Sequence, residues 1–421
     1  MGSSQPSVLI VVAKWWPLSA RLASALLRHG CIVRAVCPSG HPLHHVPGIR
    51  HFYRYDGIFS LRSLRNALRD CRPDVVVPCD DGVVAQLHAV YEQEPSLRSL
   101  IERSLGAAES YPVVESRHRF LDAALHLGVR VPRMRRIDSA ADIEAWHAHT
   151  ASASVLKVDG ESGGNGVIVS HSIGESVAAW QALRAPCSSA TAWKRLAVDR
   201  DPIAMWLRGR HRVRNVTVQE FIRGRPANSM LVCWRGALLS VVSVLVVAAE
   251  GPTGAATIVR VIQSERMTKI AELIVSRLNL SGFYGLDYIV ETGTGQPYLI
   301  EMNPRCTQLG HIELAAQGCL AGVFAAFLRD EPRPQVLNPV RSETIALFPQ
   351  ALGAGDACRP YLHSSHHDVP SEEPALVGEL MLKSWPQRRW AARLYHAFKP
   401  IDRAEPVLFE ELCAKSSAFA N

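Results

Sequence analysis

The 421-residue sequence lacks a long hydrophobic run and paired cysteines. Its longest apolar stretch, residues 238–249, is well short of the roughly 20 residues that a membrane-spanning helix needs. None of its ten cysteines forms a Cys-x-x-Cys pair, and most lie in apolar segments, where cysteine acts as a small hydrophobic residue. The first residues, MGSSQPS, have no basic region followed by a long apolar stretch, so we expect no secretion signal. We therefore expect a reduced, cytoplasmic protein that has no membrane partner.

Basic charge is also scarce. The 46 Lys and Arg residues exceed the 39 Asp and Glu residues by seven, and only seven of the 46 are Lys. The single dense run is RGRHRVR at residues 208–214. Nucleic-acid binding needs a basic stripe with interleaved aromatic residues, and the sequence has none. We therefore expect no nucleic-acid partner. The excess of basic residues would lie on a solvent-exposed face or bind an anionic small substrate.

The composition is that of a globular chain, with 48% hydrophobic and 20% charged residues, and its length suggests two or three compact units. The first hundred residues alternate buried-strand and helix patterns, which predicts an open parallel sheet with helices on both faces. A dinucleotide-binding domain needs Gly-x-Gly after the first strand, but residues 13–17 read AKWWP. The sequence therefore does not predict an NAD or FAD domain.

Further along, helix patterns cover residues 116–127, 140–149 and 265–278, and strand patterns cover 154–158, 166–170 and much of 216–249. A strong hairpin pattern follows at residues 284–303. The Pro-rich, charged stretch 330–343 predicts a boundary, and the tail beyond it has one helical patch at residues 375–397. We expect three domains, at residues 1–112, 113–330 and 331–421.

The sharpest constellation is the hairpin GLDYIVETGTGQPYLIEMNPR at residues 285–305. A turn centred near Thr294 sets Asp287 opposite Glu301, and Asn303 shares the face of Glu301. Two carboxylates and an amide oxygen in one place suit Mg²⁺ brought in by nucleotide phosphates. The alternative is a surface hairpin with an acidic rim. We favour the metal site because the strands are very apolar, where unpaired carboxylates are costly.

The second constellation is a glycine loop after a strand that ends at Lys157. Its backbone N–H groups could approach phosphate oxygens, with Lys157 as a point charge. The same loop matches Gly-x-Ser-x-Gly through Ser162, as in serine hydrolases, but that motif must lead into a helix and a strand pattern follows here. A flexible β-turn is the structural alternative.

These pieces occur in a recognisable order: Lys157 with its glycine loop, then VQEFIRG at residues 218–224, then the Asp287 strand, then EMNPR at 301–305. This order resembles the ATP-grasp superfamily of ligases, over about residues 5–330. The resemblance implies an α/β plus α+β fold, in which an N-terminal open parallel α/β domain precedes a two-subdomain ATP-grasp domain. The lid would cover about residues 150–225 and the catalytic core about 226–330.

The resemblance also implies roles for residues that match the motifs. Lys157 would contact the ATP phosphates, and the glycine loop would form a mobile lid over them. Asp287, Glu301 and Asn303 would bind two Mg²⁺ ions, with Mn²⁺ as a substitute, and Arg305 would face the transferring phosphoryl group. The lid would comprise Gly163, Gly164 and Gly166. The hinge that reads adenine would comprise Gln219, Glu220, Phe221 and Ile222.

Three departures from the family pattern matter. The first phosphate-binding Lys is absent, and Arg119 or His118 stands near its place. Pro226 replaces the usual ribose-binding acid, for which Asn228 is the available substitute. Gln308 stands where biotin-dependent carboxylases carry a Glu, which argues against a carboxylase.

The resemblance implies an ATP- and Mg²⁺-dependent carboxylate–amine ligase that forms an amide through an acyl phosphate and releases ADP and phosphate. Its partners would be a small carboxylate and an amine, with an amino acid favoured, and a homodimer is left open. Two alternatives remain: a catalytically weakened ATP-binding protein of the same fold, and, less favoured, a serine hydrolase that uses Ser162.

Overall fold

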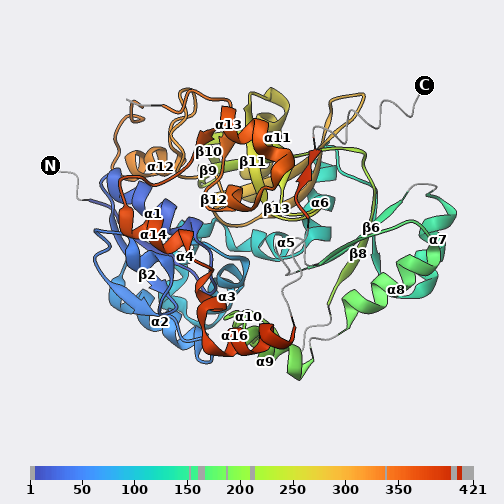
Figure 1. The fold of residues 1–421 in the computed structure, drawn as a ribbon, viewed down its shortest axis with the longest axis horizontal. Coiled ribbons are helices and arrows are strands. Elements are labelled where there is room, and N and C mark those ends of the chain that lie inside the picture. Colours follow the sequence, from blue (N-terminus) through green and yellow to red (C-terminus); the bar gives the residue numbers. More distant parts are fainter. Residues whose placement is uncertain are drawn as a thin grey trace.

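The computed structural model describes residues 5–150, 153–159, 166–185, 188–208, 214–336, 339–399 and 405–409. The chain forms three β-sheets with helices packed around them (Figure 1). Within these ranges no helix is both long and apolar enough to cross a bilayer, and the longest has 14 residues.

The N-terminal sheet is parallel and has the strand order β3-β2-β1-β4. Alternate residues of β1 enter two different cores, with Val8 and Ile10 on one face and Leu9 and Val11 on the other. Both faces are therefore covered, which confirms the predicted open parallel α/β fold. Its elements are β1 (Ser7–Val11), α1 (Leu18–Arg28), β2 (Ile32–Cys37), β3 (Phe52–Arg54), α2 (Ser60–Cys71), β4 (Val75–Pro78), α3 (Asp81–Gln93) and α4 (Arg98–Leu105).

The large sheet is mostly antiparallel and has the order β13-β12-β9-β10-β11-β14-β15, with β16 paired to β10. One face packs on α11 and the other on α12, beside the N-terminal sheet (Figure 1). A single apolar cluster runs from Ile10 through Val232 of the large sheet to Leu376, so the two sheets share a core. Its elements are β9 (Gly224–Trp234), β10 (Ala237–Ala249), β11 (Ala256–Ile262), α11 (Glu265–Leu278), β12 (Gly282–Glu291), β13 (Pro297–Asn303) and α12 (Leu320–Leu328).

The third sheet is small, has the order β5-β8-β6-β7, and packs under its own two helices, α7 and α8. It begins at Met134, upstream of the predicted lid start near residue 150. Helices α5 and α6 connect it to the N-terminal domain. Its elements and the connecting helices are α5 (Tyr111–Val114), α6 (Arg117–His126), β5 (Met134–Ile137), α7 (Ala140–Ala148), β6 (Ser154–Val158), β7 (Val167–Ser170), α8 (Ile173–Arg184) and β8 (Val216–Glu220).

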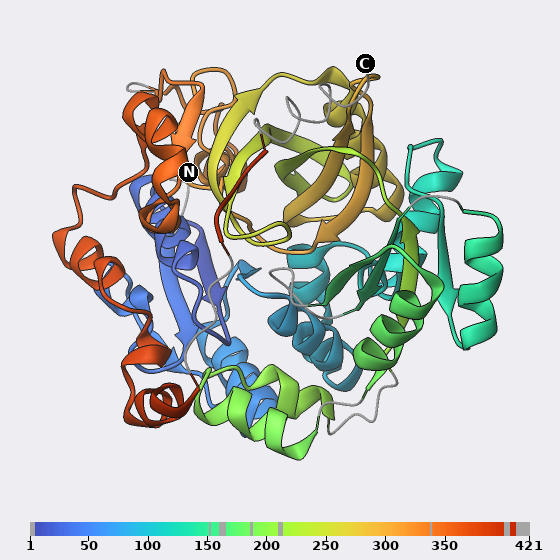
Figure 2. The ribbon, with the colours of Figure 1, turned by 45° about the vertical axis from the view of Figure 1, so that its right-hand side comes forward.

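Two helices between α8 and β8, α9 (Ser189–Ala197) and α10 (Ile203–Arg208), reach back to the N-terminal domain (Figure 2). Ile203 is buried in the core beneath α3. A β-carbon added at Gly82 would lie 2.4 Å from the Ile203 side chain, so α10 approaches α3 as closely as a glycine allows. The small sheet is therefore tied to the N-terminal domain at a second point.

The segment after residue 330 completes the large sheet. Strand β14 (Thr344–Ala346) pairs with β11, β15 (His366–His367) pairs with β14, and β16 (Val407–Leu408) pairs with β10. The helical patch predicted at residues 375–397 is three helices, because the chain breaks after Met381 and Pro386 begins a new turn. The remaining helices are α13 (Arg359–Ser364), α14 (Pro374–Met381), α15 (Trp385–Arg388) and α16 (Trp390–Phe398).

One buried ion cluster joins three distant parts of the chain. Arg21 of α1 donates to Asp368 Oδ1 at 2.7 Å, and His311 lies 2.8 Å from Asp368 Oδ2. Burial alone would raise the pKa of Asp368, but His311 and Arg21 outweigh it and hold the pKa below its usual value. The cluster therefore fixes the C-terminal segment to the N-terminal domain through a charged carboxylate.

We predict that Asp368→Asn lowers the free energy of unfolding by about 3 kcal/mol, because it leaves a buried Arg21 without its carboxylate. Urea unfolding followed by circular dichroism measures the change. Glu372→Gln, which alters an exposed acid four residues away, should leave the midpoint unchanged. Equal midpoints for the two variants would contradict the structural role of the cluster.

Candidate active site

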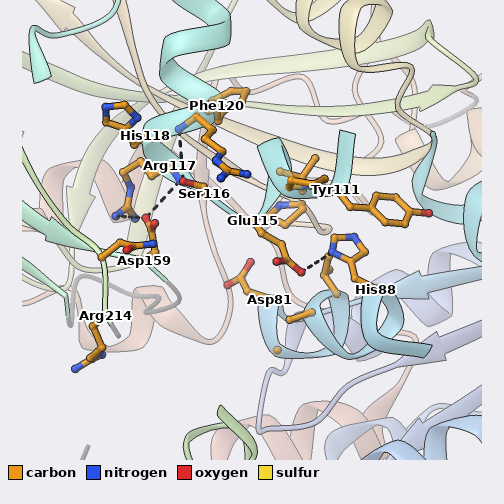
Figure 3. A pocket seen from close by; sticks show the side chains of 18 of the residues that line it. Asp81, His88, Tyr111, Glu115, Ser116, Arg117, His118, Phe120, Asp159 and Arg214 are labelled. Atoms are coloured by element: carbon orange, nitrogen blue, oxygen red, sulfur yellow. Dashed lines mark hydrogen bonds and ion pairs between the residues drawn. The ribbon is translucent and has the colours of Figure 1, made fainter. Parts of the chain in front are cut away.

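A cavity of about 1370 Å³ opens where the N-terminal domain, α5–α6 and the ends of β8 and β13 meet (Figure 3). Charged side chains line it on both sides. Residues that line it include Asp81 and His88 of α3, Arg117 at the start of α6, Asp159 after β6 and Glu301 of β13. The cavity therefore brings together side chains from all three parts of the fold.

The hairpin register predicted from the sequence is confirmed. Asp287 of β12 pairs with Glu301 of β13, with an irregularity directly after Asp287. The Asn303 amide donates to Asp287 Oδ2 at 2.8 Å, so the three predicted metal ligands lie together. Asn228, considered above for ribose binding, instead donates to Asp287 Oδ1 from the neighbouring strand β9.

The electrostatics of this set favour a cation. Burial and the nearby Glu301 carboxylate raise the pKa of Asp287 to about 6, against the hydrogen bonds from Asn228 and Asn303. A divalent cation between the carboxylates would relieve this repulsion, and hard oxygen donors suit Mg²⁺. In the described part of the chain no cluster of three His, Cys, Asp or Glu side chains could hold a metal. The fit therefore rests on two carboxylates and an amide, with phosphate oxygens to complete the shell.

The sequence interpretation missed Arg117. Its Nη2 lies 2.5 Å from Glu301 Oε1, its Nη1 donates to the Val158 carbonyl, and its side chain is 7% exposed. Burial lowers the pKa of Arg117, but Glu301 and Asp159 outweigh that and hold the pKa above its usual value. Its Nε has no hydrogen-bond partner among the described residues.

Helical phase explains the difference between Arg117 and Arg119. Ser116 caps α6, and Phe120, Leu121 and Ala124 form the buried face of that helix. Arg117 lies three and four residues before this face and shares it, whereas Arg119 is exposed on the rim of the cavity. The periodicity of residues 117–124 could therefore have identified Arg117.

Lys157 is the second-to-last residue of β6, and its side chain is buried near the same charges. Burial and Arg117 lower the pKa of Lys157 to about 8, against the attraction of Glu301 and Asp287. Gly166 is buried, and its carbonyl accepts a hydrogen bond from Val158. Gly163, Gly164 and Ser162 lie outside the described residues. The next element is β7, a strand, whereas a hydrolase nucleophile motif leads into a helix.

The predicted hinge lies at the end of β8 and just beyond it. Glu220 and Phe221 donate their backbone N–H groups to the carbonyls of Arg133 and Ala153, and the Glu220 carboxylate pairs with Arg133. Gln219 is buried, and its Nε2 lacks a partner in the described ranges. Phe221 is 38% exposed, which leaves an aromatic surface at the hinge. Ile222 is half-buried just beyond the end of β8.

Arg305 is held from three sides. Its Nε donates to Asp81 Oδ1 at 3.0 Å, its Nη2 donates to Asn303 Oδ1 at 3.4 Å, and its guanidinium lies 5.5 Å from the Trp16 ring centroid. Asp81 and Trp16 belong to the N-terminal domain, at the carboxyl ends of its strands, where open parallel sheets place ligands. The N-terminal domain therefore fixes a guanidinium beside the carboxylate set.

Solved structures of similar fold include an L-amino acid ligase from Bacillus licheniformis, at 15% identity and a TM-score of 0.56, covering 82% of this chain and 80% of that one. An N5-carboxyaminoimidazole synthetase from Staphylococcus aureus, complexed with ADP, has 11% identity and a TM-score of 0.56, covering 80% of each chain. A carboxyaminoimidazole ribonucleotide synthase from Aspergillus clavatus, complexed with ATP, has 13% identity and a TM-score of 0.57, covering 78% of each.

At these identities the likeness shows the fold, and no curated protein sequence matches the chain significantly. A family model independently matches residues 202–308 as an ATP-grasp domain. This match covers β8, the central strands and the hairpin that carries Asp287 and Glu301. Residues 202–308 therefore match an ATP-grasp domain, and the fold of the chain is similar to that of the solved structures named above.

Proposed function

We propose that the protein is an ATP-dependent carboxylate–amine ligase that forms an amide through an acyl phosphate and releases ADP and phosphate. One observation carries the proposal: beside a large cavity Arg117 lies 2.5 Å from Glu301, Asn303 donates to Asp287, and the buried Lys157 interacts electrostatically with Glu301 and Asp287. Phosphoryl transfer depends mostly on positioning and charge neutralisation, which such a set can provide.

The structural relatives support this reaction class. One is an L-amino acid ligase, and others are complexed with ADP or ATP. A further complex from Aspergillus clavatus, of 13% identity, holds ADP and 5-aminoimidazole ribonucleotide. We infer that this chain takes ATP as cosubstrate, and a small carboxylate and an amine, such as an amino acid, as partners.

Each residue has a role under this proposal. Lys157 and Arg117 bind phosphate oxygens, and Gln219 with Phe221 contacts the adenine. Asp287, Glu301 and Asn303 hold Mg²⁺, which supplies charge neutralisation when it is bound. Arg305 orients the phosphoryl group and the acyl phosphate, because a planar fork of N–H donors matches phosphate oxygens.

The second candidate is a catalytically weakened ATP-binding protein. The pairing of Arg117 with Glu301 favours it, because that pair occupies one oxygen of a proposed metal ligand. A screen of amino acids and small carboxylic acids for ADP release separates the two functions. A ligase releases ADP only when both a carboxylate and an amine are present, and mass spectrometry identifies the amide.

We predict that Glu301→Gln lowers turnover by roughly a thousandfold, the scale of losing a key electrostatic stabiliser. It also leaves Arg117 with Asp159 as its remaining carboxylate, at 3.8 Å, so the unfolding midpoint should fall as well. ADP formation at saturating Mg²⁺ measures turnover, and circular dichroism checks the fold. Glu272→Gln, at an exposed position on α11, is the control. Parent-like turnover in Glu301→Gln would exclude the metal-centred ligase.

We predict that Arg117→Met raises the KM for ATP at least about tenfold, because a buried charge-assisted contact is lost. Arg119→Met removes the same charge two residues away on an exposed position, and its KM should stay within about twofold, since exposed charges contribute little. Initial rates at varied ATP measure both. A larger increase in the KM for ATP in Arg119→Met than in Arg117→Met would indicate that Arg119 binds the phosphates.

We predict a bell-shaped pH dependence of kcat/KM for ATP. Asp287, with a pKa of about 6, is charged and able to bind a cation only above that pH. Lys157, with a pKa of about 8, is charged and able to bind phosphate only below that pH. Activity should therefore fall below about pH 6 and above about pH 8, because kcat/KM follows the free enzyme.

The alkaline limb has a specific control. Lys157→Arg keeps a positive charge throughout this range, so its residual activity should no longer decline above about pH 8. The same alkaline decline in Lys157→Arg would show that another group causes it.

A further inference from the structure

Asp81 is the acid of the N-terminal domain that reaches the reaction site. It begins α3, lines the cavity, and accepts from Arg305 Nε through Oδ1 at 3.0 Å. Its side chain is 28% exposed, and Figure 3 shows the carboxylate projecting from the end of α3 into the space between Glu115 and Asp159. One oxygen therefore anchors Arg305 while the carboxylate remains accessible from the cavity.

The neighbouring Asp80 has a different task. It is 1% exposed, accepts from the backbone of Ala13 at 2.7 Å, and caps α3 by accepting from Val83 at 2.9 Å. Those bonds fix the start of α3 against the end of β1. Asp80 therefore stabilises the fold, and of the two adjacent acids only Asp81 lines the cavity.

Charged side chains stand on both sides of the cavity. Arg117 marks the side of the proposed phosphate site, and its buried Nε, without a partner in the described chain, indicates a wall built for a polar ligand. On the N-terminal side the wall beyond Asp81 contains the His88–Glu115 pair at 2.8 Å, with the Tyr111 ring stacked on His88 at 4.0 Å. Carboxylates with aromatic faces suit an organic cation.

We propose that Asp81 binds the ammonium group of the amine substrate, and that its contact with Arg305 sets this nitrogen beside the group that Arg305 orients. The bound ammonium loses one proton to water in the cavity before its nitrogen attacks the acyl carbon, and phosphate then leaves. This inference rests on the proposed ligase function and adds the substrate class: a primary amine that is protonated at neutral pH. A neutral nucleophile such as an alcohol would gain little from this carboxylate. Asp81 is thus a binding residue for the amine and a positioning residue for Arg305.

Calorimetry on the full-length protein, saturated with a non-hydrolysable ATP analogue, tests the inference with two probes. L-Alaninamide carries a primary ammonium, and N-acetyl-L-alaninamide is its neutral counterpart. The parent protein should bind only the first. Asp81→Asn should weaken that binding at least about tenfold, the scale of losing a hydrogen bond to a charged group. Asp81→Glu should restore part of it, and Glu109→Gln, at an exposed position outside the cavity lining, should change nothing.

Several results would overturn the inference: no alaninamide binding by the parent, equal binding of both probes, or an Asp81→Asn affinity equal to that of the parent. In amine-dependent ADP formation, a purely structural role would lower kcat in Asp81→Asn without raising the KM for the amine, and that result also counts against it. Failure of the ligase proposal looks different. In that case the parent binds alaninamide through Asp81, yet ADP release does not depend on an amine.

Discussion

The structure depends most on a balance of buried charge around Glu301. Arg117 is nine-tenths buried and Lys157 almost wholly so, and neither cation could stay there without the carboxylates of Glu301, Asp287 and Asp159. The carboxylates in turn repel one another, which is visible in the raised pKa of Asp287. These charges come from α6, β6, β12 and β13, so the balance joins the small sheet to the large one.

The N-terminal domain is part of this site. Its strands share an apolar core with the large sheet, and its Asp81 and Trp16 hold Arg305. Helix α10 returns from the small sheet to bury Ile203 beneath α3, whose first residue is Asp81. Helix α10 therefore supports α3, and α3 carries Asp81, which faces the cavity. A movement of the small sheet relative to α3 would be transmitted to Asp81 through this contact.

Local patterns in the sequence predicted the parts of the site that lie within one hairpin. The Asp287–Glu301 register follows from strand alternation and a turn, and needs no long-range information. Arg117 was missed because His118 and Arg119 beside it are equally basic, and only the phase of α6 distinguishes them. The C-terminal strands were missed because β15 and β16 have two residues each, too few for a periodic pattern, and β16 pairs with β10, about 160 residues earlier in the chain. The trio of Arg305, Asp81 and Trp16 is likewise invisible without tertiary structure.

The pairing of Arg117 with Glu301 also bears on the proposed reaction. In the structure each neutralises the other, and the buried site carries little net charge. Phosphate oxygens would offer Arg117 an alternative partner, and Glu301 would then be available to the accompanying cation. Such an exchange keeps every buried charge compensated before and after binding. Nucleotide binding therefore leaves no buried ion unpaired, which would otherwise weaken the affinity. It also makes binding of the nucleotide and of the cation mutually dependent, because neither Arg117 nor Glu301 can be released alone without leaving the other buried and poorly compensated.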